Sequence, residues 1–344
     1  MANSYSFARL WLTRLAVIGV LVTATVVALG AWTRLEDAGL GCPDWPGCYG
    51  SITVPLSETA IERAALLYPD QPLVAEKAWP EMIHRHFAKT IGLICIFIAG
   101  FAFAAARREK NIPVKHAVFL LALVCLQGAF GAWTVTMKLF PPVVTGHLLL
   151  GFLTFTTLLL LVVRLSPFLR ASGNRAVASL LPMAVFATAV LVAQIALGGW
   201  TASNYAATMC TDLPICQDGW IQQMDWREAF TIHTYAGTTY EFAPHLEWEA
   251  KRTIHVAHRI GAIVATVVLA LLALLVWVKG AAPRYRRFAV ILTLVLVAQV
   301  SLGVANVIFH LPLAVAVAHN FVALVLLQVL ATLTFSLVQE RKRA

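Results

Sequence analysis

The chain has 344 residues, of which 60% are hydrophobic and only 12% are charged. A soluble domain carries about a quarter charged residues, so this composition excludes a water-soluble globular protein and indicates an integral membrane protein. The formal net charge of +9 does not indicate a nucleic-acid partner, because the basic residues follow the ends of apolar segments.

Eight apolar segments are long enough to cross a bilayer, which takes about 20 residues of helix. Backbone polar groups inside lipid must pair within their own segment, so the predicted fold class is all-α integral membrane. The first segment is too long for the apolar core of a signal peptide and lacks a convincing cleavage site, so we expect it to be retained. The predicted spans are residues 11–33, 82–106, 116–136, 142–164, 177–200, 253–278, 288–309 and 312–336.

The charges predict the topology of these eight helices. The side that holds both termini carries 16 of the 26 basic residues but only Glu109 and Glu340 among the 17 acidic ones. Cytoplasmic loops are enriched in Lys and Arg, so we expect both termini in the cytoplasm of a bacterium and the chain in its inner membrane. Two long loops, about 35–80 and 202–251, then lie on the outer side. Within the first, Ser57–Val74 is either a short amphipathic helix or a plain loop.

The chain repeats itself in order. Residues 16–34 and 184–202 share the pattern ALG-x-W-T at a spacing of 168 residues. Further features recur at nearly the same spacing, namely the cysteines Cys42 and Cys48 (Cys210 and Cys216), the His84-Arg85 pair (His258-Arg259), and Gln127, Gly131 and His147 (Gln299, Gly303 and His319). Such register predicts two tandem four-helix bundles, residues 1–170 and 171–344, with one orientation because each holds an even number of helices.

Four histidines lie just inside the predicted outer ends of their spans: His84, His147, His258 and His319. Neutral imidazole is an axial ligand of haem iron, and facing helices of a bundle build such sites. A single intramembrane histidine is most often a polar residue at a helix interface. Two equivalent pairs at matched depth instead predict two haem sites near the periplasmic face. The spans supply almost no carboxylates for a di-metal site.

Residues beside these histidines extend the prediction. Arg85 and Arg259 directly follow a histidine, and each is expected either to pair with haem propionates or to reach lipid headgroups. Glu81 lies on the same helix face as His84, one turn outward, either as a base or charge stabiliser or as an ordinary carboxylate of a helix N-terminus. The corresponding position before His258 is His255, a candidate for contact with a propionate or with the iron ligand.

The cysteine pairs predict two disulfides. Cys42 and Cys48 stand in the first long outer loop, and Cys210 and Cys216 repeat their spacing in the second. The outer compartment is oxidising, so we expect each pair to close a small loop over its histidine pair. The bridges are either structural or able to exchange with thiols.

These features together resemble the haem A synthase family. The match rests on the run Glu81-Met82-Ile83-His84-Arg85, on His147, on His258-Arg259 with His319, on the loop cysteines and on the duplication, and it covers nearly the whole chain. The resemblance implies oxidation of the C8 methyl of haem O to a formyl group, which gives haem A for cytochrome oxidase. It further implies a partner, haem O synthase, and an electron acceptor that the sequence does not identify.

The same resemblance implies a division of roles. His84 and His147 would bind the substrate haem O, His258 and His319 would bind a resident haem b, and Glu81 would be the catalytic carboxylate. An iron held by two histidines has no vacant position, which favours removal of electrons from the substrate and attack by water over oxygen activation at that iron. The alternatives are a duplicated b-type cytochrome that only transfers electrons, and a haem carrier.

Overall fold

The computed structural model describes residues 7–166, 173–234 and 239–344. Eight helices of the described chain are long and apolar enough to cross a membrane, which confirms the predicted fold class. Over the same residues the extended structure is limited to an isolated bridge between Cys48 and Ser51. The chain divides into two compact units, residues 1–167 and 168–344.

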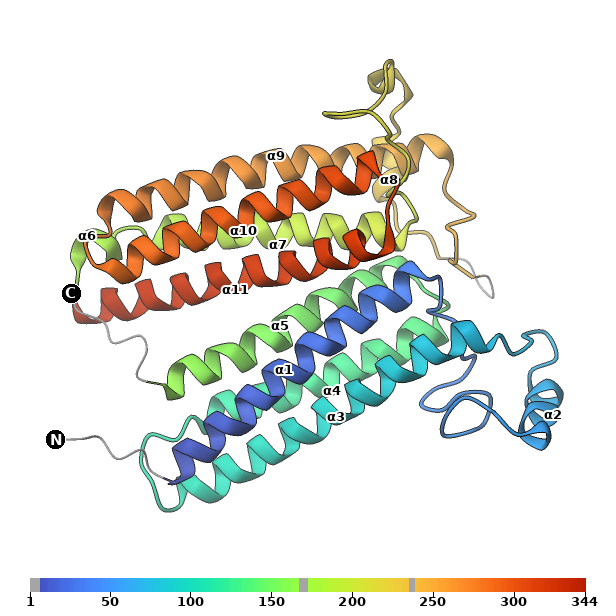
Figure 1. Cartoon of the computed structure of the whole chain (residues 1–344), viewed down its shortest axis with the longest axis horizontal. Coiled ribbons are helices and arrows are strands. Elements are labelled where there is room, and N and C mark those ends of the chain that lie inside the picture. The colour runs from blue at the N-terminus through green and yellow to red at the C-terminus, as the bar shows by residue number, and fades with distance from the viewer. Residues whose placement is uncertain (1–6, 167–172, 235–238) are drawn as a thin grey trace. The chain divides into compact units, whose positions relative to one another are not determined.

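The first unit is a ring of four long helices with a short helix in its loop. In chain order these are α1 (Phe7–Leu35), α2 (Glu58–Leu67), α3 (Ala75–Ala106), α4 (Val114–Thr136) and α5 (Pro141–Leu165). Each long helix packs on two neighbours, α1 on α3, α3 on α4, α4 on α5 and α5 on α1. Helices α3 and α5 therefore lie diagonally opposite, and Figure 1 shows α2 at the end where α3 begins.

The second unit has the same order of neighbours. Its elements are α6 (Arg175–Ala178), α7 (Leu181–Ser203), the 3₁₀ helix η1 (Trp220–Gln223), α8 (Trp226–Phe230), α9 (Trp248–Lys279), α10 (Pro283–Ile308) and α11 (Leu313–Arg343). Helix α7 packs on α9, α9 on α10, α10 on α11 and α11 on α7, which places α9 and α11 diagonally (Figure 1).

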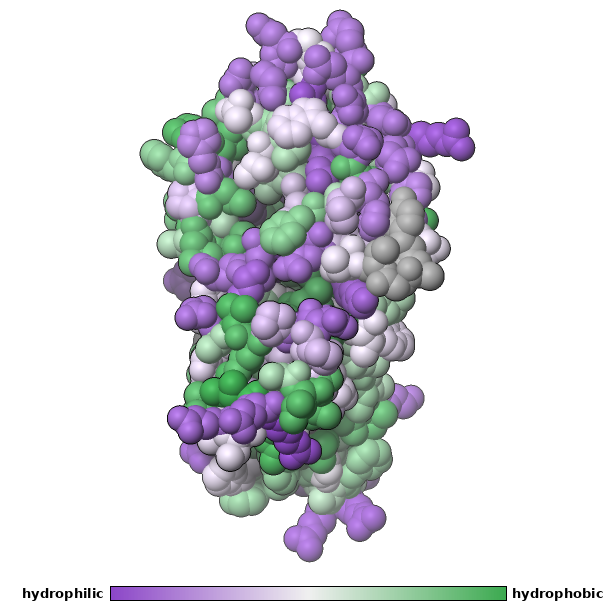
Figure 2. Space-filling view, turned by 90° about the vertical axis from the view of Figure 1, so that its right-hand side faces the viewer, coloured by the Kyte–Doolittle hydropathy of each residue, from purple (hydrophilic) through white to green (hydrophobic). Residues whose placement is uncertain are grey.

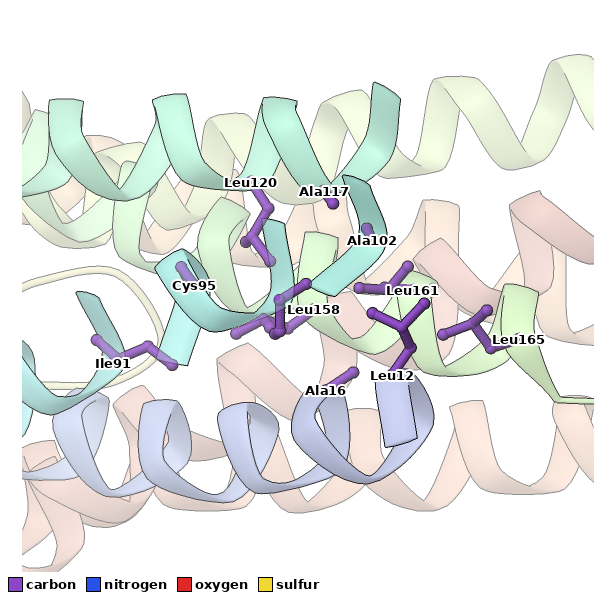
Figure 3. Close-up of a cluster of buried hydrophobic side chains, with 11 residues drawn as sticks. Leu12, Ala16, Ile91, Cys95, Ala102, Ala117, Leu120, Leu158, Leu161 and Leu165 are labelled. Atoms are coloured by element: carbon purple, nitrogen blue, oxygen red, sulfur yellow. The ribbon is translucent and has the colours of Figure 1, made fainter. Parts of the chain in front are cut away.

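The apolar core of the first unit fills the end of the bundle away from the long loop. Figure 3 shows its side chains meeting from all four long helices. The buried members are Leu12, Ala16, Ile91, Cys95, Ile98, Ala102, Ala117, Leu120, Leu158, Leu161 and Leu165. They come from the first half of α1 and α4 and the second half of α3 and α5. The loop end of the bundle has a separate, smaller buried cluster that includes Cys42, Cys48 and Met82.

Helices α3 and α9 begin well before the predicted spans. Helix α3 begins at Ala75, not near residue 82, and α9 begins at Trp248, not near residue 253. The apolar runs stop at the first charged residues, but the helices continue beyond them. The stretch from Ser57 contains the helix α2, capped by the Ser57 hydroxyl, which accepts a hydrogen bond from the Ala60 amide. Figure 2 shows hydrophilic side chains among apolar ones at the loop-bearing end.

Candidate functional site

The diagonal helices of the first unit bring His84 and His147 together. Their ring centroids are 6.4 Å apart, and their planes are inclined by 73°. Two imidazoles that bind one metal from opposite sides have ring centres roughly 6 Å apart, because each metal–nitrogen bond is about 2 Å long. Both side chains are half-buried. The pair therefore has the separation that a shared iron requires.

Each of the four predicted ligands packs its ring edge on a glycine of a neighbouring helix. A Cβ atom built on Gly30 of α1 would lie 3.0 Å from Cε1 of His84, and one on Gly131 of α4 would lie 3.2 Å from that of His147. In the second unit, a Cβ built on Gly198 would lie 3.3 Å from Cε1 of His258, and one on Gly303 would lie 3.1 Å from that of His319. The missing side chains let the imidazoles approach the helix backbones closely.

Hydrogen bonds orient the rings within the bundles. Nδ1 of His84 lies 3.1 Å from the Val26 carbonyl oxygen. Nδ1 of His258 lies 3.1 Å from the Gln194 amide nitrogen, which also donates to the His258 carbonyl. A metal-binding histidine typically donates its second ring N–H to an acceptor, which the Val26 carbonyl supplies for His84.

Among the four predicted ligands, two ring nitrogens are buried with no hydrogen-bond partner in the described part of the chain, Nδ1 of His147 and Nδ1 of His319. A buried polar atom without a hydrogen bond is costly, so such atoms call for an explanation. Haem ligation supplies one, because an iron bound to that nitrogen would be its partner. Among the described residues no three His, Cys, Asp or Glu side chains cluster as a metal-ion site. Histidine pairs suit an iron that brings its own porphyrin nitrogens.

Glu81 and Arg85 join α3 to the first cysteine loop. Glu81 is 5% exposed, forms an ion pair with Arg85, and accepts a 2.9 Å hydrogen bond from the Cys42 amide. Arg85 also donates to the carbonyl oxygens of Asp44, at 2.7 Å, and Gly47. These contacts hold the loop against the helix turn that carries His84.

The second unit builds the same contact with different chemistry. The Cys210 amide donates to Nδ1 of His255 at 3.1 Å, as the Cys42 amide does to Glu81. Arg259 donates to the carbonyl oxygens of Cys210, Asp212 and Ile215 at 2.6, 2.5 and 2.8 Å. Its Nε lies 3.3 Å from Nε2 of His255. The carboxylate of the first unit is thus replaced by an imidazole in an equivalent place.

Both predicted disulfides are present, Cys42–Cys48 and Cys210–Cys216. Cys42 and Cys48 are buried in a small cluster that includes Ala64 of α2 and Met82 of α3. Each bridge closes the loop whose carbonyls the adjacent arginine binds. Each cysteine loop is therefore closed by a disulfide and held against its helix by an arginine.

The structure shows which partners the predicted arginines have and identifies two further residues beside the histidines. Arg85 and Arg259 contact loop carbonyls, a partner that the sequence did not suggest; contact with propionates stays a prediction. Gln194 and Val26 were missed, because at corresponding positions of α7 and α1 they differ and so carry no signal of repetition. Their spacing of four residues from Gly198 and Gly30 is the signal that could have revealed them.

The chain is similar to known proteins over nearly its whole length. The model of the family COX15-CtaA, described as "Cytochrome oxidase assembly protein", matches residues 13–331. A protein of Shewanella oneidensis named "Heme A synthase" is 43% identical over 95% of this chain and 96% of its own length. Proteins of the same name from Chelativorans sp. and Mesorhizobium japonicum are 28% and 26% identical, over 93% and 90% of this chain and 89% and 85% of their own.

Proposed function

Because the chain belongs to the haem A synthase family, we propose that its two units divide one oxidation between a substrate site and a resident cofactor site. The chain is a multi-pass membrane oxidoreductase of haem biosynthesis that acts on haem O and yields haem A. Its relatives favour this activity over electron transfer alone. The observation that supports the substrate site is the His84–His147 pair, whose ring centroids are 6.4 Å apart, together with the buried carboxylate of Glu81 one turn away from His84.

The first unit is the proposed substrate site. His84 and His147 would bind the iron of haem O from opposite faces, and the glycines beneath them would fix the ring positions. Glu81 is the one carboxylate in the turn that precedes His84. Its two oxygens already accept hydrogen bonds from Arg85 and the Cys42 amide, which stabilise the charged form that a base requires.

Glu81 is the proposed base of the reaction. Removal of an electron pair and a proton from the C8 methyl breaks one C–H bond and leaves a cationic carbon that water can attack. A carboxylate beside the substrate can accept the proton of that water and stabilise the positive charge. A second round gives a geminal diol, which loses water to form the aldehyde.

The second unit is the proposed resident site. His258 and His319 would hold a haem b, which when bound carries the electrons away to an acceptor. His255 stands where Glu81 stands in the first unit and accepts the Cys210 amide in the same way. Without a carboxylate there, this unit has no group equivalent to the proposed base. Arg259 would hold the loop above the site.

The charge distribution supports a topology for the proposal. The basic side of the chain would face the cytoplasm, and both sites with their disulfides would face the periplasm across the inner membrane. An oxidising compartment is where such disulfides persist. Haem O would come from a haem O synthase.

The test is the haem composition of cells that make haem O and express this chain. With the parent protein, extraction and mass spectrometry should find haem A. Glu81→Gln should retain bound haem but form little or no haem A, whereas Glu76→Gln, an exposed residue of the same helix, should behave as the parent. Full conversion by Glu81→Gln would rule out the carboxylate role. Tightly bound haem b without any haem A in the parent would identify an electron-transfer cytochrome.

A further inference from the structure

Three helices carry a glutamine one turn before the glycine that touches a predicted ligand. The pairs are Gln127 and Gly131 on α4, Gln194 and Gly198 on α7, and Gln299 and Gly303 on α10. On α1 the corresponding residues are Val26 and Gly30. Residues four apart lie on one helix face, so each glutamine and its glycine present a single surface to one histidine.

Each glutamine contacts its histidine directly. The amide nitrogen of Gln127 lies 3.0 Å from the His147 carbonyl oxygen and 3.5 Å from Nε2 of the ring. The amide nitrogen of Gln299 lies 3.3 Å from Nε2 of His319. Together with the bond between Gln194 and His258, these contacts place an amide beside three of the four rings.

The opposing helices make room for two of these amides. A Cβ on Gly151, one turn after His147, would lie 3.3 Å from the Gln127 amide nitrogen. A Cβ on Gly261, three residues after His258, would overlap the Gln194 amide. Phe87 stands three residues after His84, where Val26 leaves no amide to accommodate. Between α7 and α9 the glutamine and the space for it are present together, whereas between α1 and α3 both are absent.

The three amides and two of the histidine rings have buried polar atoms that make no hydrogen bond. Within the described chain, the side-chain oxygens of Gln127, Gln194 and Gln299 are buried without a hydrogen bond. So are the ring nitrogens Nδ1 of His147 and His319. An imidazole that binds iron through one nitrogen carries a proton on the other, and that N–H needs an acceptor. The unpaired acceptor oxygens belong to the amides that already touch the rings, at Nδ1 of His258 and at Nε2 of His147 and His319, so an amide that turns over brings its oxygen to that ring nitrogen.

We propose that Gln127, Gln194 and Gln299 are positioning residues that act when their histidines bind haem. Each amide group would turn so that its oxygen accepts the N–H of the adjacent ring nitrogen, Nδ1 of His258 and Nε2 of His147 and His319, while the other nitrogen of the ring binds the iron. The backbone carbonyl of Val26 has this role for His84. The inference rests on the proposed haem ligation and adds what orients each ligand. An acceptor at the ring N–H makes the imidazole a stronger donor to the iron, so it stabilises the oxidised haem. Three haem ligands are thus tuned by a side chain, and His84 by a fixed helix carbonyl.

Gln299→Leu and Gln299→Glu in the full-length protein, purified with its bound haem, test the proposal. Leucine removes the acceptor, so the reduction potential of the resident haem should rise and its low-spin electron paramagnetic resonance signal should change. Haem affinity should fall by about 10- to 100-fold, as for other partners of metal-binding histidines. Glutamate retains an acceptor oxygen, so the potential should return to the parent value or lie below it.

The proposal is overturned if Gln299→Leu leaves the potential and the spectrum unchanged, or if both variants shift the potential in the same direction or lose haem equally. The glycine has its own control on α4, because a Cβ on Gly128 meets nothing within 4 Å. Gly131→Ala should displace the His147 ring and weaken haem binding, whereas Gly128→Ala should not. His319→Ala separates the two levels of the argument: if it leaves the haem spectrum intact, the ligand assignment fails first.

Discussion

Replacing Arg85 by leucine should release the first cysteine loop from α3. Arg85 is 7% exposed, and its guanidinium pairs with Glu81 and donates to the carbonyl oxygens of Asp44 and Gly47. Removing one partner of a buried ion pair costs about 3–5 kcal/mol, because the other charge stays buried without compensation. Each 1.4 kcal/mol is about a tenfold change in an equilibrium, so local opening of the loop should become roughly a hundredfold to a few thousandfold more frequent.

Hydrogen exchange followed by mass spectrometry measures this opening at the Cys42 amide, which donates to Glu81. The control is Arg34→Leu, which removes a more exposed ion pair with Asp37. Such surface pairs contribute about 0–1 kcal/mol, so that variant should exchange nearly as the parent does. Equal exchange in Arg85→Leu and Arg34→Leu would refute the claim that Arg85 holds the loop.

Three further predictions concern stability. Cys42→Ser should destabilise the first loop by about 2 kcal/mol, the loop-closure entropy of a short bridge, visible as faster proteolysis between residues 42 and 74; unchanged cleavage would contradict it. Glu340→Ala should lower the unfolding free energy of the second unit by about 3–5 kcal/mol, because Glu340 is fully buried and binds Arg284, the Tyr285 hydroxyl and the Gly173 amide. Thermal unfolding in detergent measures this loss, and Glu62→Ala, at an exposed residue, is the control. Burial and the nearby carboxylates of Glu81 and Asp44 raise the pKa of Tyr49, whose hydroxyl donates to the Pro72 carbonyl. A raised pKa means stability that is present below a pH of about 10 and lost as the pH rises through the folded pKa, so melting should fall more steeply with alkaline pH in the parent than in Tyr49→Phe.

The sequence predicted the helices and both disulfides because their signals are local or compositional. Apolar runs reveal spans wherever they lie, and cysteines at a repeated spacing reveal bridges. The helix limits were less accurate, since α3 and α9 begin before the apolar runs do. The helix within 57–74 was one of two options, and its decisive feature is the Ser57 cap.

The sequence did not predict contacts between residues that lie far apart in the chain. Arg85 was expected near propionates or headgroups, yet it reaches the carbonyl of Asp44, 41 residues earlier in the chain. The role of Gln127 and Gln299 was equally hidden, although both were noticed as repeated residues. A glutamine can form a hydrogen bond with a histidine only if their helices are neighbours, and the sequence does not show which helices are neighbours. The proximity of His84 and His147 was predictable because ionisable residues are rare in apolar helices, and their binding of haem stays a prediction.

The account depends on two histidine pairs with different haems, and one measurement addresses it most directly. The parent, His84→Ala and His258→Ala are purified from cells that supply haem O, and their bound haems are extracted and identified by mass spectrometry. The account predicts that His84→Ala retains haem b but loses haem O and haem A, and that His258→Ala loses haem b. The same haem complement in all three proteins would contradict it.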